Sequence, residues 1–164
     1  MSKPRLAVVG ADATDKDRPL SLGPLTGIVG FHVAQAAVTT YEAFEKHIGV
    51  PFGLRKVEFS LLILLHANGA LSPKQLATAL TLTSPNLTLL LDRLQARGLL
   101  KRERNPSDGR SQHIRLTDTG QRVARDGAAA AQPMERELQQ RLSKAEHAML
   151  IELLCRLAGR SPPG

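Results

Sequence analysis

The chain has 164 residues, of which 42% are apolar, so its length suits one domain with appended helices and its composition excludes wholesale disorder. The formal net charge is +7, and a basic balance favours a polyanionic partner because each bound phosphate releases condensed counterions. Cys155 is the single cysteine, which excludes an internal disulfide and a zinc site built from several cysteines. Aromatic residues are 3% and Trp is absent, so stacking platforms for single-stranded nucleic acid are poorly supplied.

The N-terminal region predicts an arm followed by two helices. Residues 1–23 mix charges, Gly and Pro without a helical period, so we interpret them as a flexible N-terminal arm. From Leu25 to about His47 apolar residues recur at helical spacing, and Gly49 and Pro51 are expected to end that helix. A helix over about 55–67 is apolar nearly all round, which predicts a place at the centre of the fold.

Two Ser-Pro pairs then predict two helix starts, since a capping hydroxyl is followed by Pro at the first helical position. Ser72-Pro73 opens a short helix to Leu80, and Ser84-Pro85 opens a second one that runs to Arg97 and is closed by Gly98. The spacing of these caps leaves room for two helices and a tight turn, which is the spacing of a helix-turn-helix.

A hairpin and two further helices complete the pattern. Residues 99–104 and 110–116 are expected to be strands, joined by the turn-rich segment 105–109. Thr117 is placed to cap the next helix, which Pro133 is expected to kink or break. Ser143, with Glu146 three residues later, predicts the capping box of a last helix that ends near Ala158. The hairpin following the helix pair is the wing of a winged helix-turn-helix.

The excess positive charge gathers on this winged segment. From Leu54 to Thr117 there are ten Lys or Arg residues and four Asp or Glu residues, a net charge of +6. No paired carboxylates, nucleophile elbow, metal-ligand cluster or phosphate-binding loop is present, so neither an enzyme nor a cofactor is expected. A winged helix used for protein contact is a further alternative, but the Arg-rich hairpin and the polar start of the second helix favour DNA.

With these elements in order, the sequence resembles the MarR family of bacterial regulators from about Leu25 to Ala158. The resemblance rests on Asp108-Gly-Arg110-Ser-Gln-His-Ile114-Arg-Leu116-Thr117 in the wing, and on Leu87-Thr88, Leu91-Asp92-Arg93-Leu94 and Arg97-Gly98-Leu99 in the second helix of the pair. It implies a mainly α fold with a small β-wing, as a MarR-like homodimer with N- and C-terminal dimerisation helices. Residues 24–160 would form a single MarR-type domain, with a winged helix-turn-helix lobe at 54–117 and dimerisation helices at 24–48 and 118–160.

The resemblance also implies a DNA-binding repressor, released from a palindromic operator by a small aromatic or phenolic ligand. A MarR-like regulator that has no small-molecule effector, or that acts as an activator, is the alternative. The partners expected of the repressor are double-stranded operator DNA, a second copy of the chain and a small-molecule effector. No run of about 18 apolar residues and no secretion signal is present, so a cytoplasmic protein without a membrane span is expected.

For the recognition helix, short polar groups are expected at base edges and cations at phosphates. Asn86 is suited to a bidentate pair with adenine, and Thr88 to a thymine methyl or a phosphate. Arg110 either enters the minor groove while Asp108 shapes the turn, or pairs with Asp108. Leu87, Leu90, Leu91 and Leu94 are expected to face the core. The full set of candidate DNA contacts is Ser84, Pro85, Asn86, Thr88, Arg93, Arg97, Lys101, Arg102, Arg104, Asp108, Arg110 and Arg115, each of which also has a solvated or capping interpretation.

The sequence patterns that indicate dimerisation and ligand binding are less specific than those for DNA binding. In the last helix Met149, Leu150, Leu153, Leu154 and Leu157 form an apolar stripe, which indicates either subunit contact or an ordinary core face. The ligand candidates mix apolar walls with a few polar groups. They are Phe31, His32, Gln35, Tyr41, Phe59, Ile63 and His66, with core packing as the alternative for both histidines. Nothing beside Cys155 except Arg156 favours a reactive thiolate, so an inert cysteine is expected.

Overall fold

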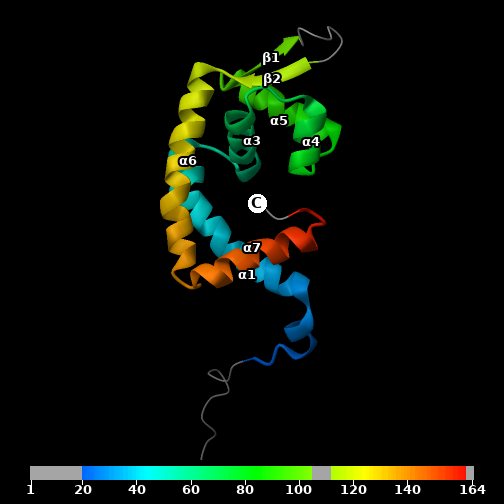
Figure 1. Cartoon of the computed structure of the whole chain (residues 1–164), viewed down its shortest axis with the longest axis vertical. Helices are drawn as coiled ribbons and strands as arrows, with labels where there is room; N and C mark the ends of the chain where they lie inside the picture. Colours follow the sequence, from blue (N-terminus) through cyan, green and yellow to red (C-terminus); the bar gives the residue numbers. More distant parts are fainter. Residues whose placement is uncertain (1–19, 105–111, 162–164) are drawn as a thin grey trace, which may run out of the picture. The chain divides into compact units, whose positions relative to one another are not determined.

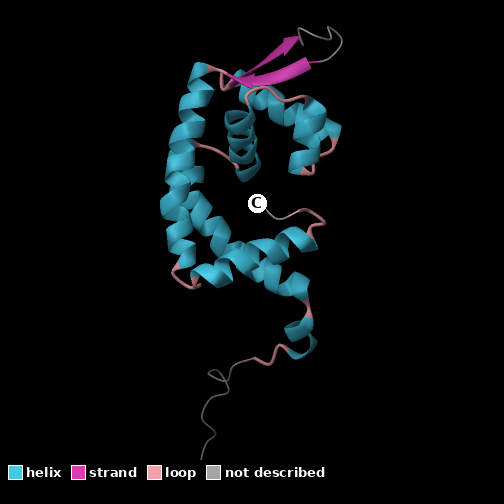
Figure 2. Cartoon of the chain, viewed as in Figure 1, coloured by secondary structure: helices cyan, strands magenta, loops and turns pink. Residues whose placement is uncertain are grey.

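The computed structural model describes residues 20–104 and 112–161. These residues are helical apart from one hairpin and short connections (Figures 1 and 2). The chain divides into two compact units, residues 1–36 and 37–164. Its elements, in order, are η2 (Gly23–Gly27), α1 (Val29–Phe44), η3 (Glu45–Gly49), α2 (Val50–Phe52), α3 (Lys56–Asn68), α4 (Pro73–Leu80), α5 (Ser84–Ala96), β1 (Leu100–Arg104), β2 (Gln112–Leu116), α6 (Asp118–Gln139) and α7 (Lys144–Leu157).

The described part of the first unit, residues 20–36, consists of the 3-10 turn η2 and the start of α1. Its side chains are exposed except that of Phe31, which is partly buried against the edge of the His32 ring. The Nε2 atom of His32 lies 3.0 Å from the carbonyl oxygen of Thr26, so the ring ties α1 to η2. Residues 1–19 of the predicted arm lie outside the described residues.

In the second unit, helical structure continues past the predicted stop at Gly49 and Pro51. The segment η3 is a π-helix, α2 follows it directly, and the chain leaves the helix only at Gly53, whose φ is +59°. The amide of Leu54 donates to the carbonyl of Gly49, five positions earlier, at 3.1 Å, which is the spacing of a π-helix. The wider π turn accommodates Pro51, which has no N–H to donate and would clash in a regular turn. The predicted end at Gly49 is therefore wrong.

The core of the second unit is built around α3, as its apolar pattern predicted. Leu61, Leu62 and Leu65 of α3 have no exposed surface. They pack in one cluster with buried side chains of α4, α5, the hairpin and α6, namely Leu76, Leu87, Leu90, Leu91, Leu94, Leu99, Leu100, Ile114, Leu116 and Ala124. Burial of a leucine is worth about 1.5–3 kcal/mol, so this cluster fixes the helix pair and the hairpin on α3.

The hairpin is a two-stranded antiparallel sheet in which Leu100 lies opposite Leu116 and Arg104 opposite Gln112. Leu71, just before α4, adds one bridge to Ile114, with its amide and carbonyl both bonded at 3.1 and 2.8 Å. This bridge joins the start of the helix pair to the hairpin, so the two parts form one rigid lobe.

The long helix α6 leaves the hairpin through a tight joint and lies along α3 (Figure 1). Thr117 caps it as predicted, because its Oγ1 accepts from the Gly120 amide at 3.0 Å and donates to the Gly98 carbonyl at 2.6 Å. A Cβ at Gly120 would collide with the Leu99 carbonyl oxygen, so only glycine allows this close approach. Pro133 lies inside α6 and does not break it, contrary to the break considered from the sequence.

The capping box predicted for the last helix is present, since Ser143 accepts from the Glu146 amide and Glu146 accepts from the Ser143 amide. Cys155 of α7 is partly buried. No helix within residues 20–104 or 112–161 is long and apolar enough to cross a membrane.

Candidate DNA-binding surface

The helix pair α4–α5 has the predicted geometry, with a sharp turn between its members. Ser72 and Gln75 form a capping box at the start of α4. At its end, Thr81 adopts a left-handed conformation with φ +55°, and the Leu82 amide closes the turn on the Ala77 carbonyl at 2.9 Å. A β-branched residue rarely adopts this conformation, so the surrounding lobe must hold the turn that aims α5.

The recognition helix α5 presents its polar start and Leu89 to solvent and its other four leucines to the core. Ser84, Pro85, Asn86 and Thr88 are exposed. Leu87, Leu90, Leu91 and Leu94 are buried, as predicted. One detail differs: the helix begins at Ser84 itself, because Thr83 has the extended backbone of a capping residue and makes no side-chain bond. Ser84 therefore does not cap α5, and its hydroxyl is not needed for that role.

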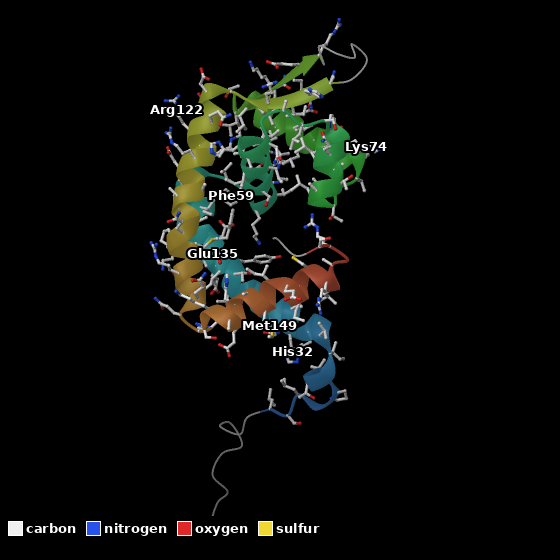
Figure 3. All side chains as sticks on the ribbon, viewed as in Figure 1. His32, Phe59, Lys74, Arg122, Glu135 and Met149 are labelled. Carbon is white, nitrogen blue, oxygen red and sulfur yellow. The ribbon has the colours of Figure 1, made fainter. Side chains whose placement is uncertain are left out.

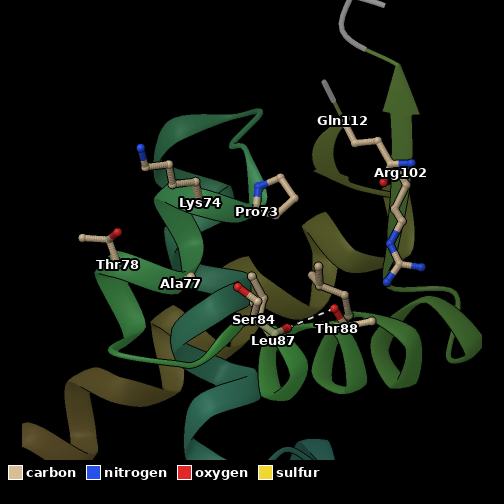
Figure 4. Close-up of a pocket in the computed structure, with 10 residues that line it drawn as sticks. Pro73, Lys74, Ala77, Thr78, Ser84, Leu87, Thr88, Arg102 and Gln112 are labelled. Carbon is tan, nitrogen blue, oxygen red and sulfur yellow. Dashed lines mark hydrogen bonds between the residues drawn. The ribbon is translucent and has the colours of Figure 1, made fainter. Parts of the chain in front are cut away.

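A recess of about 440 Å³ opens beside this polar start (Figure 4). It lies between α4, the first two turns of α5 and the hairpin. Thr88 borders it, with its hydroxyl bonded to the Ser84 carbonyl at 3.0 Å. Its lining residues are Pro73, Lys74, Ala77, Thr78, Ser84, Leu87, Thr88, Leu91, Arg102 and Gln112. Both charged residues in this lining are cations, of which Arg102 also pairs with Asp92 of α5.

Two residues of α4 in this lining, Lys74 and Thr78, were not among the sequence candidates. Both are exposed, and they lie four residues apart on one face of the short helix (Figure 4). The cap at Ser72 fixes the register of α4, so a helical wheel started there finds this face. Its proximity to Ser84 and Thr88 depends on the fold.

The hairpin cations are held by neighbouring carboxylates. Arg102 pairs with Asp92 of α5 at 2.6 Å. Lys101 and Arg115 both pair with Glu103, at 2.7 and 3.1 Å. The hydrogen bond from Lys101, and the positive charges of Lys101 and Arg115, lower the pKa of Glu103 below its usual value. The hairpin therefore carries its cations in ordered positions, and Arg104 is exposed at the end of β1.

Arg93 and Arg97, further along α5, converge on one buried carboxylate. Glu58 of α3 is 2% exposed and accepts from Arg93 at 3.3 Å and from Arg97 at 3.5 Å. It also accepts from the Arg55 amide at 2.9 Å, which caps α3. Arg97 reaches the Phe52 carbonyl as well, at 3.4 Å. Sequence reasoning did not select Glu58, which fastens the recognition helix to the central helix.

Asp108 and Arg110 of the predicted wing tip lie outside the described residues, so their two alternative roles stay predictions.

Known proteins have similar sequences and the same type of fold. Residues 54–112 match the MarR family. The multiple antibiotic resistance protein MarR of Salmonella typhimurium is 30% identical over 105 residues, which cover 63% of this chain and 73% of that protein. The transcriptional repressor CouR, in a structure bound to a 23-mer DNA duplex, is 32% identical with a TM-score of 0.78, covering 86% of this chain and 99% of CouR. The chain belongs to the MarR family.

A third relative extends the match along most of the chain. The putative transcriptional regulatory protein for the hcr operon of Thauera aromatica is 27% identical over 135 residues, which cover 82% of this chain and 81% of the relative. The resemblance seen in the sequence is thus confirmed, as is the mainly α fold with a winged helix-turn-helix. The protein is a DNA-binding transcriptional regulator of the MarR family.

The ligand candidates of this MarR-family chain are divided between the two units. Phe31, His32 and Gln35 belong to the first unit, whereas Tyr41, Phe59, Ile63 and His66 belong to the second. In the second unit the Nδ1 of His66 lies 2.7 Å from the Gln121 side chain of α6. The Tyr41 ring lies beneath the ammonium of Lys56. Phe59 and Ile63 line a common cavity between α3 and α4.

The apolar stripe of α7 is left exposed by the residues that the structure describes. Met149, labelled in Figure 3, is 61% exposed, and Leu150, Leu153, Leu154 and Leu157 are exposed as well. No residue of α7 is buried within the described chain. The interpretation of the stripe as an ordinary core face is therefore wrong for the single chain.

Proposed function

We propose that this MarR-family regulator is a homodimeric repressor that binds a palindromic operator and releases it when a small aromatic or phenolic ligand binds. The observation that carries the proposal is the exposed polar start of α5 beside a recess whose charged lining residues, Lys74 and Arg102, are cations. A major groove admits such a helix, and the cations around the recess suit the phosphates on its rim.

Within this surface we assign base contacts to the start of α5. Asn86 pairs with adenine, and Ser84, Pro85 and Thr88 lie beside it on the same exposed turns. Phosphate contacts fall to Lys101, Arg102, Arg104 and Arg115 of the hairpin, with Lys74 of α4 added from the fold. Asp108 and Arg110 supply the wing tip. Arg93 and Arg97 reach phosphates with their exposed edges while Glu58 holds them from behind.

The exposed apolar face of α7 supports a dimer. Large apolar side chains at this exposure normally mark an interaction surface. One subunit reads too few base pairs to select an operator, whereas two recognition helices about 34 Å apart read successive turns of a palindrome. The repressor role is supported by the likeness to CouR, a transcriptional repressor solved on DNA.

The domain arrangement proposed with this function keeps the sequence boundaries. Residues 24–160 form one MarR-type domain, residues 54–117 its winged lobe, and residues 24–48 and 118–160 its dimerisation helices. Residues 1–23 form an arm outside this domain.

The test begins with selection of binding sites from random duplex DNA by the purified chain, followed by fluorescence anisotropy on the selected site. A palindromic site, bound by two chains, is expected. The affinity should fall steeply with salt, since each neutralised phosphate contributes a slope of about −0.9 to log K against log salt. Lys74→Ala should reduce that slope by about one unit. Arg136→Ala, an exposed cation on α6, is the matched control. Selection of no sequence, or binding independent of salt, would contradict the proposal.

The dimer is tested by sedimentation velocity. Leu153→Glu places a charge on the exposed apolar face of α7 and should yield monomers, whereas Arg156→Glu on the same helix should stay dimeric. A wild-type chain that sediments as a monomer at micromolar concentration would refute the dimer. Repression is tested with a reporter gene behind the selected operator, where activation on expression of the chain would instead favour an activator.

A further inference from the structure

One leucine of α5 faces water. Leu89 is 63% exposed, whereas the other four leucines of the helix are buried. Successive residues of an α-helix are rotated by about 100°, which places Leu89 roughly 150° from the mean direction of those four. Pro85, one turn earlier, and Asp92, one turn later, are exposed on the same side. Leu89 thus lies on the ridge of α5 that points away from the core of the lobe.

The charged residues one turn after Leu89 are paired with other side chains. Asp92 pairs with Arg102 of the hairpin at 2.6 Å, and Arg93 pairs with Glu58 of α3 at 3.3 Å. The first pair neutralises a carboxylate that would otherwise repel the phosphates of a duplex beside this ridge. On the other side of Leu89, Pro85 lies about 6 Å away along the helix axis and is apolar. The ridge around Leu89 is therefore apolar or balanced in charge.

A single exposed leucine is ordinary on most protein surfaces, but the outward ridge of a recognition helix is a special position. This ridge enters the major groove, where side chains meet the base edges. Donors and acceptors cover most of those edges, and the thymine methyl is the apolar group among them. An aliphatic side chain that covers a donor or acceptor leaves it without a partner, which costs free energy, whereas contact with a methyl group is favourable. A leucine on this ridge therefore favours thymine.

We propose that Leu89 is a specificity-determining residue of this regulator and packs against a thymine methyl group in each half of its operator. The assignment rests on the proposed function, since it requires α5 to lie in the major groove. Leu89 lies one turn further along α5 than Asn86, so it adds a base contact beyond those proposed for the polar start of the helix. Burial of one methyl-sized group contributes about 0.8 kcal/mol, which corresponds to about a fourfold change in affinity.

The methyl group is tested by replacing thymines of the selected operator with deoxyuridine, which pairs with adenine in the same way but has no methyl group. Thymines related by the two-fold symmetry of the operator are replaced together, and the affinity of the full chain is measured by fluorescence anisotropy. At one such pair the wild type should lose affinity about fifteenfold, the product of two fourfold effects. Leu89→Ala should bind the unmodified operator at least as weakly, and deoxyuridine at that pair should weaken it no further.

Variants at the same position separate the methyl contact from other roles. Leu89→Met keeps an apolar side chain of similar volume and should retain the dependence on the methyl group, whereas Leu89→Gln should lose it. The salt slope of Leu89→Ala should equal that of the wild type, because no phosphate contact is removed. Val50→Ala removes a 77% exposed apolar side chain outside α5 and is the matched control, with wild-type affinity and full methyl dependence expected. Circular dichroism should show the wild-type fold throughout, since Leu89 packs little against the core.

Two results would overturn the role of Leu89. One is an operator whose affinity for the wild type depends on no thymine methyl group. The other is an equal effect of deoxyuridine on the wild type and on Leu89→Ala, which would assign the methyl contact to Thr88 instead. Both leave operator binding, and hence the proposed function, intact. Failure of the proposed function is a different result, because the chain would then select no site at all, and the role of Leu89 would fall with it.

Discussion

The shared carboxylate of Glu58 makes a quantitative prediction about the recognition helix. It is 2% exposed, whereas the side chains of Arg93 and Arg97 are 44% and 36% exposed. Either arginine alone leaves the carboxylate one cation, so Arg93→Ala and Arg97→Ala should each cost about 1 kcal/mol of unfolding free energy, the upper end for solvent-exposed pairs. The double variant leaves a buried charge without a cation, which costs about 3–5 kcal/mol. The double variant should therefore lose at least about 1 kcal/mol more unfolding free energy than the two single variants lose together.

The complementary change removes the charge from the other side. Glu58→Gln keeps the shape and one acceptor for the Arg55 amide, and both arginines then face water, so it should cost only about 1–2 kcal/mol. In the Glu58→Gln background, the two arginine changes should become additive. Any excess that persists there would show that the coupling does not pass through Glu58.

The assay is urea unfolding followed by far-ultraviolet circular dichroism, because the chain has no Trp to report by fluorescence. Wild type, the three arginine variants and the same set with Glu58→Gln complete the cycle. Additive costs in the wild-type background, within about 0.5 kcal/mol, would refute the shared carboxylate. Operator binding by the folded variants separates the two roles, since loss of a phosphate contact at Arg97 lowers the salt slope whereas loss of a purely structural contact does not.

Four further predictions concern the surface and the caps. Asn86→Ala should reduce the preference for one base pair per half-site by about 1–3 kcal/mol, as measured by competition between duplexes of different sequence. An equal loss of affinity for all sequences would make Asn86 a positioning contact instead. Arg110→Ala should weaken operator binding and leave the dimer intact, and unchanged affinity in anisotropy would remove the wing tip from the interface. Glu103→Gln should raise affinity for random duplex DNA and steepen its salt dependence, because it releases Lys101 and Arg115; an unchanged salt slope would contradict this. Hydrogen bonds from Ser143 hold the pKa of Glu146 below its usual 4.5, so its contribution to stability is complete above that pH and is lost as the pH falls through the lowered value. Glu146→Gln should therefore lose stability at pH 7 but not at pH 2 in urea titrations, and an equal loss at both would contradict it.

Elements whose ends are set by local chemistry were predictable from the sequence. The caps at Ser72, Thr117 and Ser143 form as expected, because a hydroxyl and the amides it serves lie within three residues. The burial of Leu87, Leu90, Leu91 and Leu94 in α5 follows from helical spacing alone. At Thr83 and Ser84 two adjacent hydroxyl residues compete for one cap, and the sequence gives no means of choosing between them.

Features that depend on distant parts of the chain were not predictable. Glu58 and its arginines are separated by 35 and 39 residues, so nothing local indicates that Arg93 and Arg97 meet a carboxylate. The continuation of the helix past Gly49 depends on a π turn, whose wider spacing no apolar period predicts. For the same reason Lys74 was not selected, since its closeness to Ser84 arises only when α4 and α5 pack on α3.

The ion pairs of the hairpin bear on how such a surface binds DNA selectively. Lys101 lies directly opposite Arg115 across the two strands, an arrangement of like charges that destabilises a sheet. Glu103 relieves it by accepting from both, at 2.7 and 3.1 Å. A DNA phosphate presents the same charge and acceptor type, so it competes with Glu103 for Lys101 and Arg115. This competition weakens contact with any duplex by a similar amount, and it leaves a larger share of the discrimination to the base contacts of α5.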